Sequence, residues 1–354
     1  MRHGARDRAL TGALPPVEER ADGPRPGDHV AVLVNSSARR AGHGRWRDAV
    51  EAVLARRFRP SFRYPASQPD MVRAAHACVS DGLGAVVVAG GDGTVNAVAG
   101  TLAGTRVPMG VLPLGTGNDL VRTLGLPPEP VAAARALLDA RPRRLDLVEV
   151  NGRPFCTVGL LGIVAESAVS VIRANATGSR WRPFVAPFGA AAYRVSGVAS
   201  LLAPRRLARR VQITYRDPLS QREQTIERDA VGFFIANGRH LGGGLALPVQ
   251  ARVDDGAFEI CIVRATARAR LLWGFACLVQ GWTLPEGVLE VLRADRATIA
   301  FAEEGPFSAD GEDMCAASRF DFCVRPAALT VLAGPNGGTE RRATDRPGPE
   351  DREP

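Results

Sequence analysis

AVVVAGGDGTVNAVAGTL, residues 85–102, is the stretch that decides the fold. It places a short apolar run, Ala85 to Ala89, directly before a glycine-rich turn and a segment that suits a helix. A buried strand that turns through glycines into a helix presents free backbone N–H groups, and the helix dipole favours negative charge there. The stretch therefore predicts a strand–turn–helix unit whose turn binds phosphate through four residues: Gly90, Gly91, Gly93 and Thr94.

Asp92 lies inside this turn. A carboxylate beside bound phosphates would be repelled unless it met a metal ion or the hydroxyl of a second substrate. The pair Asp92-Gly93 also suits a plain turn that closes a strand without any chemistry. Both interpretations stay open on this segment by itself.

A second glycine-rich turn, PLGTGNDL at residues 113–120, follows the apolar run VPMGVL at residues 107–112. It again predicts a short strand that leads through a turn into a helix. Two such turns, about twenty residues apart, are typical of neighbouring units whose carboxyl-end loops meet on one edge of a parallel sheet. The second turn extends the predicted nucleotide site by Gly115, Thr116, Gly117 and Asn118.

The chain divides by pattern into two folded parts and two tails. Residues 28–146 alternate helical periods with short apolar strands, which predicts an α/β domain built on a parallel sheet. Residues 147–325 are rich in short apolar strands, which favours an antiparallel, sandwich-like domain, and residues 326–335 form a closing strand. Residues 1–27 and 336–354 are rich in charge, Pro and Gly and are expected to be disordered.

All 45 basic residues of the 354-residue chain are arginine, and the formal net charge is +8. The lack of lysine excludes the lysine-bearing phosphate loop, the protein-kinase ATP-binding lysine and Schiff-base catalysis. A phosphate clamp must therefore use backbone amides, a metal ion or arginine, with four candidates: Arg39, Arg40, Arg122 and Arg143. The charge favours nucleotides, acidic lipid headgroups or nucleic acid, and does not choose among them.

The motifs GGDGTVNAV and PLGTGNDLVRTLGLP resemble the catalytic domain of the diacylglycerol kinase family, which includes bacterial lipid kinases and the related sphingosine kinases. Further matches follow in the family's order: RRLDL (143–147), IANG (235–238), DDGAFE (254–259) and DGE (310–312). The resemblance implies an N-terminal α/β domain with a parallel sheet of the NAD kinase and diacylglycerol kinase type. It also implies a β-rich, sandwich-like second domain and a closing strand that returns to the first.

The same resemblance implies the reaction, an ATP-dependent transfer of the γ-phosphoryl group to a lipid hydroxyl, with diacylglycerol or a related lipid alcohol as the expected acceptor. Glu312 matches the glutamate that serves as general base in the family, and Asp92 would position the phosphates or the acceptor hydroxyl. Asn35 would join the ATP site. Hard divalent ions prefer oxygen ligands, so three carboxylates are the expected Mg²⁺ ligands: Asp146, Asp254 and Asp255.

Three departures from the family pattern keep alternatives open. Asn35 is followed by Ser36 where the family has Asn-Pro, Val164 stands where many relatives carry Asp, and Glu259 replaces a common Asp. One alternative is a NAD kinase, which shares GGDGT but phosphorylates a soluble dinucleotide. Another is a nucleotide-binding, membrane-associated protein without catalysis. The pair Asp310-Gly311 also suits a plain hairpin turn.

The sequence predicts a cytoplasmic protein in peripheral contact with a membrane. The six cysteines form no CxxC pair, the first residues lack the apolar run of a secretory signal, and no run of about eighteen apolar residues is free of charge. Residues 181–202 would either lie at an anionic membrane surface or form a core helix of the second domain, and the core helix is favoured. The expected partner is the lipid substrate at the membrane surface, not nucleic acid, and a homodimer stays open.

Overall fold

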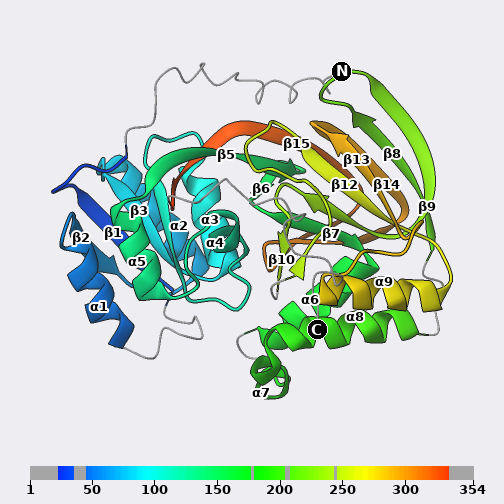
Figure 1. Cartoon of the computed structure of the whole chain (residues 1–354), viewed down its shortest axis with the longest axis horizontal. Helices are drawn as coiled ribbons and strands as arrows, with labels where there is room; N and C mark the ends of the chain where they lie inside the picture. The colour runs from blue at the N-terminus through cyan, green and yellow to red at the C-terminus, as the bar shows by residue number, and fades with distance from the viewer. Residues whose placement is uncertain (1–22, 36–44, 177–178, 204–207, 243–244, 335–354) are drawn as a thin grey trace, which may run out of the picture.

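The computed structural model describes residues 23–35, 45–176, 179–203, 208–242 and 245–334 (Figure 1). The tails expected at residues 1–27 and 336–354 lie outside these ranges, apart from residues 23–27. Two of the four arginines named as phosphate clamps, Arg39 and Arg40, also lie outside the described residues.

The N-terminal part is a three-layer α/β arrangement. Its strands pair in parallel in the order β2 (Arg59–Arg63), β1 (His29–Val34), β3 (Ala85–Gly90) and β4 (Met109–Pro113). Alternate residues of β1 and β3 face opposite sides of the sheet. One side packs on α2 (Gln68–Ser80) and α3 (Asp92–Leu102), and the other on α1 (Arg45–Leu54) and α5 (Pro130–Leu138). The short helix α4 (Asp119–Thr123) follows β4.

The C-terminal part is antiparallel and folds over a core rich in phenylalanine. Its strands are β5 (Arg141–Val150), β6 (Arg153–Phe155), β7 (Val158–Gly162), β8 (Arg209–Arg216), β9 (Glu223–Ala236), β12 (Phe258–Arg264), β13 (Leu289–Ala294), β14 (Arg296–Ala309) and β15 (Glu312–Ala333). The first halves of β9 and β14 pair with β8 and their second halves with β7. These long strands therefore turn the sheet back on itself. The strands β10 (His240–Leu241) and β11 (Leu245–Ala246) form a separate ribbon.

The two parts share one sheet, because β15 belongs to both. This strand of 22 residues pairs antiparallel with β14 and β5 and, at Val331, in parallel with Met109 of β4. The expected closing strand is the C-terminal end of β15. A boundary drawn after residue 146 falls inside β5, since pairing across the sheet leaves no signature in local composition.

Helices lie together on one side of the C-terminal part (Figure 1). They are α6 (Ile163–Asn175), α7 (Arg182–Val185), the 3₁₀ turn η1 (Ala186–Phe188), α8 (Ala190–Leu202) and α9 (Arg268–Gln280). A helix within residues 181–202 is one of the two interpretations considered above, whereas α6 is not predicted from the sequence. The reason is local: β7 turns directly into α6 at Gly162, which has a φ of 69°, so no polar turn separates the two elements.

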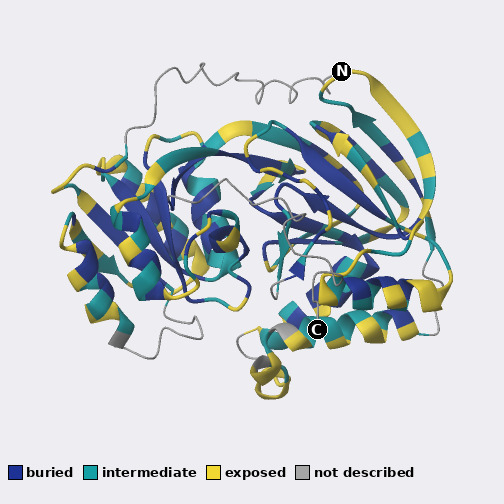
Figure 2. Cartoon of the chain, viewed as in Figure 1, coloured by how far each residue is buried: buried dark blue, intermediate teal, exposed yellow. Residues whose placement is uncertain are grey.

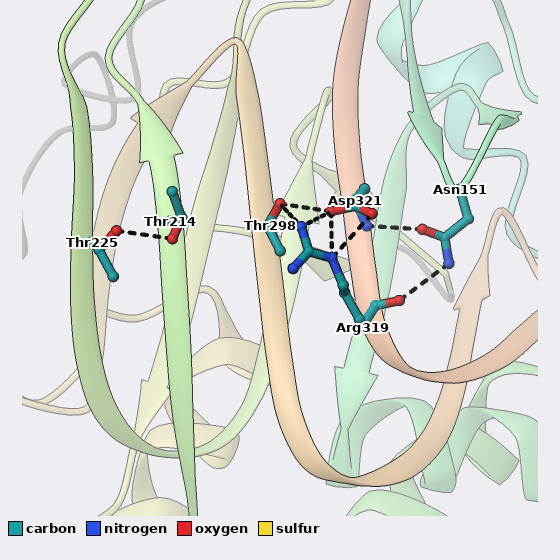
Figure 3. A network of polar contacts seen from close by, with 6 residues as sticks. All are labelled: Asn151, Thr214, Thr225, Thr298, Arg319 and Asp321. Carbon is teal, nitrogen blue, oxygen red and sulfur yellow. Dashed lines mark hydrogen bonds and ion pairs between the residues drawn. The ribbon is translucent and has the colours of Figure 1, made fainter. Parts of the chain in front are cut away.

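A network of exposed polar residues links β14, β15 and the turn between β5 and β6 (Figure 3). Asn151 lies in the turn between β5 and β6 with a φ of 47°, and its Oδ1 accepts from the Asp321 N–H at 2.8 Å. Thr298 of β14 donates to the Asp321 carboxylate at 2.6 Å. These exposed polar residues therefore make hydrogen bonds that link neighbouring strands. They do not line the cavity described below.

Candidate active site

The two glycine-rich turns lie side by side at the carboxyl ends of β3 and β4. Leu114 N–H donates to Gly90 O at 3.0 Å, and a Cβ on Gly115 would lie only 2.5 Å from the Cα of Gly91. Only glycine permits such a close approach of two backbones. Gly91 precedes α3 in an extended conformation and no side chain caps this helix. The first N–H groups of α3 are therefore available to an anion, as the sequence predicts.

Asn35 connects the end of β1 to the first turn. Its Nδ2 donates to Thr94 Oγ1 at 2.6 Å, and both residues line the same cavity as Thr116. Arg122 lies beside the second turn, where its Nε donates to Gly117 O at 3.3 Å. Arg143 is instead bound to Asp254, so the structure does not bring it to the turns.

Asp92 links the two turns rather than pointing freely at a ligand. Its carboxylate oxygens accept from the N–H groups of Asn118, at 2.8 Å, and Asp119, at 2.6 Å. Burial raises the pKa of Asp92, and the same two N–H groups oppose that shift. The sequence predicts that Asp92 contacts phosphate, a metal ion or the acceptor hydroxyl. In the structure Asp92 has a further role as the clamp that holds α4 against α3.

Asn118 shapes the second turn from within. It has a left-handed backbone, with a φ of 53°, and its side chain accepts from Gly115 N–H at 3.1 Å and donates to Gly115 O at 3.0 Å. The side-chain amide of Asn118 therefore makes its hydrogen bonds within the turn. Gly115, Thr116 and Gly117 are the members of this turn that line the cavity with Asp119.

Glu312 is brought to the first turn by a tight hairpin between β14 and β15. Asp310 and Gly311 both have positive φ, 49° and 80°, and Ala309 pairs with Glu312 across them. The Glu312 carboxylate lies so close to Gly93 that a Cβ on this glycine would overlap it. The pair Asp310-Gly311 is therefore a hairpin turn, and this turn places Glu312 beside the first glycine-rich turn. Burial, then the charges of Asp310 and Asp313, raises the pKa of Glu312.

Two further carboxylates, which the sequence does not single out, are buried at this site. Asp310 accepts from the N–H groups of Cys156, at 2.6 Å, and Thr157, at 3.0 Å, and burial raises its pKa to about 6. Burial, then the charges of Asp92 and Asp310, raises the pKa of Asp119 to about 8. Asp119 Oδ1 is buried without a hydrogen-bond partner in the described structure. Asp119 ends the motif GTGND and Asp310 begins the motif DGE, so their place in these motifs is the sequence feature that could have identified them as site residues.

The three expected magnesium ligands do not form a cation site. Asp146 accepts from the N–H groups of Gly256 and Ala327, both at 2.7 Å, and so holds strand ends together. Asp254 pairs with Arg143 and Arg252, and Asp255 pairs with Arg293 at 2.6 Å. Within the ranges that the structure describes, no group of three His, Cys, Asp or Glu residues is placed to hold a metal ion. None of the three carboxylates lines the cavity.

A cavity of about 540 Å³ joins both turns and Glu312 to the helices of the C-terminal part. Its polar end consists of the two turns and the hairpin at residues 308–312. Its other end is apolar and formed mainly by side chains from α6, α8 and α9: Val164, Ala168, Leu201, Leu271, Phe275 and Leu278. Val164, a departure from the family's Asp, thus contributes to an apolar wall.

Tyr193 of α8 stands where the polar and apolar ends meet, within the segment of residues 181–202 for which the sequence favours a core helix. It lines the cavity. Burial is the main cause that raises the pKa of its hydroxyl, followed by the negative charges of Asp92 and Glu312. This position near Asp92 and Glu312 arises only when three separate segments of the chain fold together, so no local sequence motif reveals it.

Comparison with known proteins assigns the family. The diacylglycerol kinase catalytic domain model matches residues 29–150, and the YegS C-terminal NAD kinase beta sandwich-like domain model matches residues 170–333. A Pseudomonas aeruginosa protein named "Probable lipid kinase YegS-like" is 31% identical over 306 residues, which cover 86% of this chain and 94% of that protein. The diacylglycerol kinase of Mycobacterium tuberculosis is 29% identical, over 74% of this chain and 80% of its own. The chain belongs to the diacylglycerol kinase-like family of lipid kinases.

A solved structure supports the fold. The crystal structure of a diacylglycerol kinase from Bacillus anthracis aligns with a TM-score of 0.64 at 20% identity, and the match covers 87% of this chain and 97% of that one. In the described part of this chain, no helix has both the length and the apolar character needed to span a bilayer.

Proposed function

We propose that this chain transfers the γ-phosphoryl group of ATP to the hydroxyl of diacylglycerol or a related lipid alcohol. The observation that carries the proposal is the single cavity that joins a phosphate-type turn, a buried glutamate and an apolar pocket. A phosphoryl donor and an acyl-chain acceptor need these two environments in contact, because the reacting oxygen and phosphorus must meet away from bulk water.

The N-terminal part would hold the nucleotide. The N–H groups at the start of α3 would bind phosphate oxygens, assisted by the hydroxyls of Thr94 and Thr116, while Asn35 fixes Thr94. Asp92 would act by holding the second turn beside the first, through the Asn118 and Asp119 N–H groups. Positioning of this kind is the main protein contribution to phosphoryl transfer.

Glu312 would be the general base. Its carboxylate would take the proton from the acceptor hydroxyl as that oxygen forms a bond to the γ-phosphorus and the bond from this phosphorus to the β,γ-bridging oxygen breaks. The products are ADP and a phosphorylated lipid. The raised pKa of Glu312 suits this role, because a stronger base accepts a proton more readily at neutral pH.

Magnesium fits this site only as an ion that arrives with ATP. A magnesium ion is commonly held by one or two carboxylates together with substrate phosphates. Asp119 is suited to supply one, because it lines the cavity and its Oδ1 is buried without a partner in the described structure. Bound there, the ion would neutralise triphosphate charge.

The apolar end would hold the acceptor. Its walls match hydrocarbon chains, whereas a soluble dinucleotide would leave its ribose hydroxyls and phosphates against aliphatic side chains. The cavity therefore favours a lipid over NAD as the acceptor. It does not select one lipid alcohol among others, since an apolar wall reads chain shape more than headgroup chemistry.

Labelled phosphate transfer tests the proposal. The chain is incubated with γ-labelled ATP and, separately, with a lipid extract, diacylglycerol or NAD, and Glu312→Gln is compared with Glu304→Gln, an exposed glutamate of β14. We expect label in lipid, a loss of about 10²–10⁴-fold in rate for Glu312→Gln only, and unchanged ATP affinity. Label in NAD but not in lipid, or ATP binding without transfer to any lipid, would overturn the proposal.

A further inference from the structure

Exposed aromatic and aliphatic side chains lie on α7, η1, α8 and α9 and in the residues next to α7 and α9. Phe184 and Phe188 are 68% and 65% exposed, and Leu202, Trp181, Trp273 and Trp282 are each more than half exposed. Trp181 packs edge-on against Phe184 with ring centroids 6.4 Å apart, and Trp273 packs against Trp282 at 6.0 Å. These five aromatic side chains and Leu202 are together called the aromatic patch below. Figure 2 shows exposed residues along the outer sides of the helices that carry it.

The same helices also form the wall of the cavity. On α8, Leu201 lines the cavity while the adjacent Leu202 is exposed; on α9, Gly274 lines it while Trp273 is exposed. A surface helix of a water-soluble domain normally carries polar residues on its outer side. Helices α8 and α9 carry apolar side chains on both sides. For residues 181–202, one side of α8 packs in the core, as the core-helix interpretation predicts, and the other side is exposed, as a membrane-surface segment would be.

The two stretches of sequence that carry most of the patch contain arginine and no acidic residue. No acidic residue occurs between Glu166 and Asp217, or between Glu259 and Glu286. Arg180, Arg182 and Arg270 are exposed next to patch residues, and Arg180 stacks on Trp181 at 5.2 Å. Two copies of this chain would bring like charges together if they met through this surface. An anionic bilayer would instead pair with the arginines while the aromatic rings entered the headgroup region.

We infer that the aromatic patch docks the protein on the surface of an anionic lipid bilayer, with the outer sides of α8 and α9 facing the membrane. Phe and Trp side chains with arginine beside them are the composition that favours the membrane interface. This inference rests on the proposed function in one respect, that an acceptor lipid must pass from the bilayer to the cavity. The docking itself requires neither ATP nor turnover.

Sedimentation with vesicles tests the inference with the full chain and without ATP or acceptor. The vesicles are phosphatidylcholine with or without phosphatidylglycerol, and the variants are Phe184→Ser with Trp273→Ser, Arg180→Gln with Arg182→Gln, and Leu219→Ser. Leu219, in the turn between β8 and β9, is 88% exposed and outside the patch, so it is the matched control. Retained ATP binding shows that each variant is folded, because none of these residues lines the cavity.

We expect wild type to bind the phosphatidylglycerol vesicles. The aromatic double variant should bind them at least about tenfold more weakly, and the arginine double variant about fivefold more weakly per arginine, with Leu219→Ser unchanged. The inference is overturned if wild type stays in solution, if the aromatic variant binds like wild type, or if lipid-free wild type is a dimer that the aromatic variant dissociates. Binding by a chain that phosphorylates no lipid would leave docking intact and reject only the proposed function.

Discussion

Glu312 owes its position to Gly93, since the carboxylate occupies the space that a Cβ on this residue would take. The sequence predicts both residues, because each lies in a motif where local geometry is restrictive: a glycine turn before a helix and an Asp-Gly hairpin. It does not predict their contact. That contact depends on β15, which brings the hairpin from the other part of the molecule.

Gly93→Ala is expected to slow transfer to a rate close to that of Glu312→Gln. The added methyl group must displace either the Glu312 carboxylate or the first turn of α3. A double-mutant cycle checks this, and the double variant should be no slower than Glu312→Gln by itself, because both changes remove the same placed base. Gly100→Ala is the control on the same helix, where the new Cβ meets a proline ring at 3.1 Å. Additive losses in the double variant would reject the shared cause.

Carboxylates were harder to assign from sequence than glycines. The sequence predicts Asp254 and Asp255 as metal ligands, yet arginines distant in the chain, Arg143 and Arg293, already pair with them. The sequence does not single out Asp119, although its buried Oδ1 makes it the better candidate for a metal ligand. A carboxylate's role depends on which groups surround it in space, and local sequence does not contain that information.

Among the helices and strands, the placement of the second turn beside the first depends on two hydrogen bonds between Asp92 and the start of α4. Both strand–turn–helix units and their adjacency were predictable, because an apolar run followed by glycines is a strong local signal. The clamp made by Asp92 was not predictable, because its carboxylate accepts from two backbone N–H groups that lie 26 and 27 positions further along the chain. Helix α6 was missed for a related reason, as β7 passes into it without a polar turn.

Asp92→Asn is expected to abolish labelled phosphate transfer and to weaken ATP binding. The new amide can accept only one of the two N–H groups, and a partly buried N–H left without an acceptor costs about 1–3 kcal/mol. Circular dichroism and ATP titration separate a lost turn from a lost fold, with exposed Asp139→Asn as the control. Wild-type incorporation of label would remove Asp92 from the mechanism.

Across the whole molecule, buried acids make stability depend on pH. Burial, then the Asp255 charge, raises the pKa of Glu259 to about 7, against the opposing charge of Arg293, and Glu259 Oε2 has no hydrogen-bond partner in the described structure. A raised acid pKa means that the folded state binds more protons than the unfolded state between the ordinary pKa of 4.5 and about 7. Stability should therefore fall as pH rises through this window.

Glu259→Gln should raise the melting temperature at pH 8 by a few degrees and leave it nearly unchanged at pH 4, on the order expected for removing one buried charge. Thermal unfolding followed by circular dichroism across this range provides the measurement. Glu223→Gln, at an exposed position of β9, should change neither value. A Glu259→Gln variant that is less stable than wild type at pH 8 would show that the ionised carboxylate is favourable where it lies.

The most direct test is a crystal structure of the chain with a non-hydrolysable ATP analogue and diacylglycerol. We predict the γ-phosphate at the turn of residues 90–94, the acceptor hydroxyl between this phosphate and Glu312, and the acyl chains along α6, α8 and α9. A nucleotide bound away from that turn, or a lipid bound outside the shared cavity, would contradict this prediction.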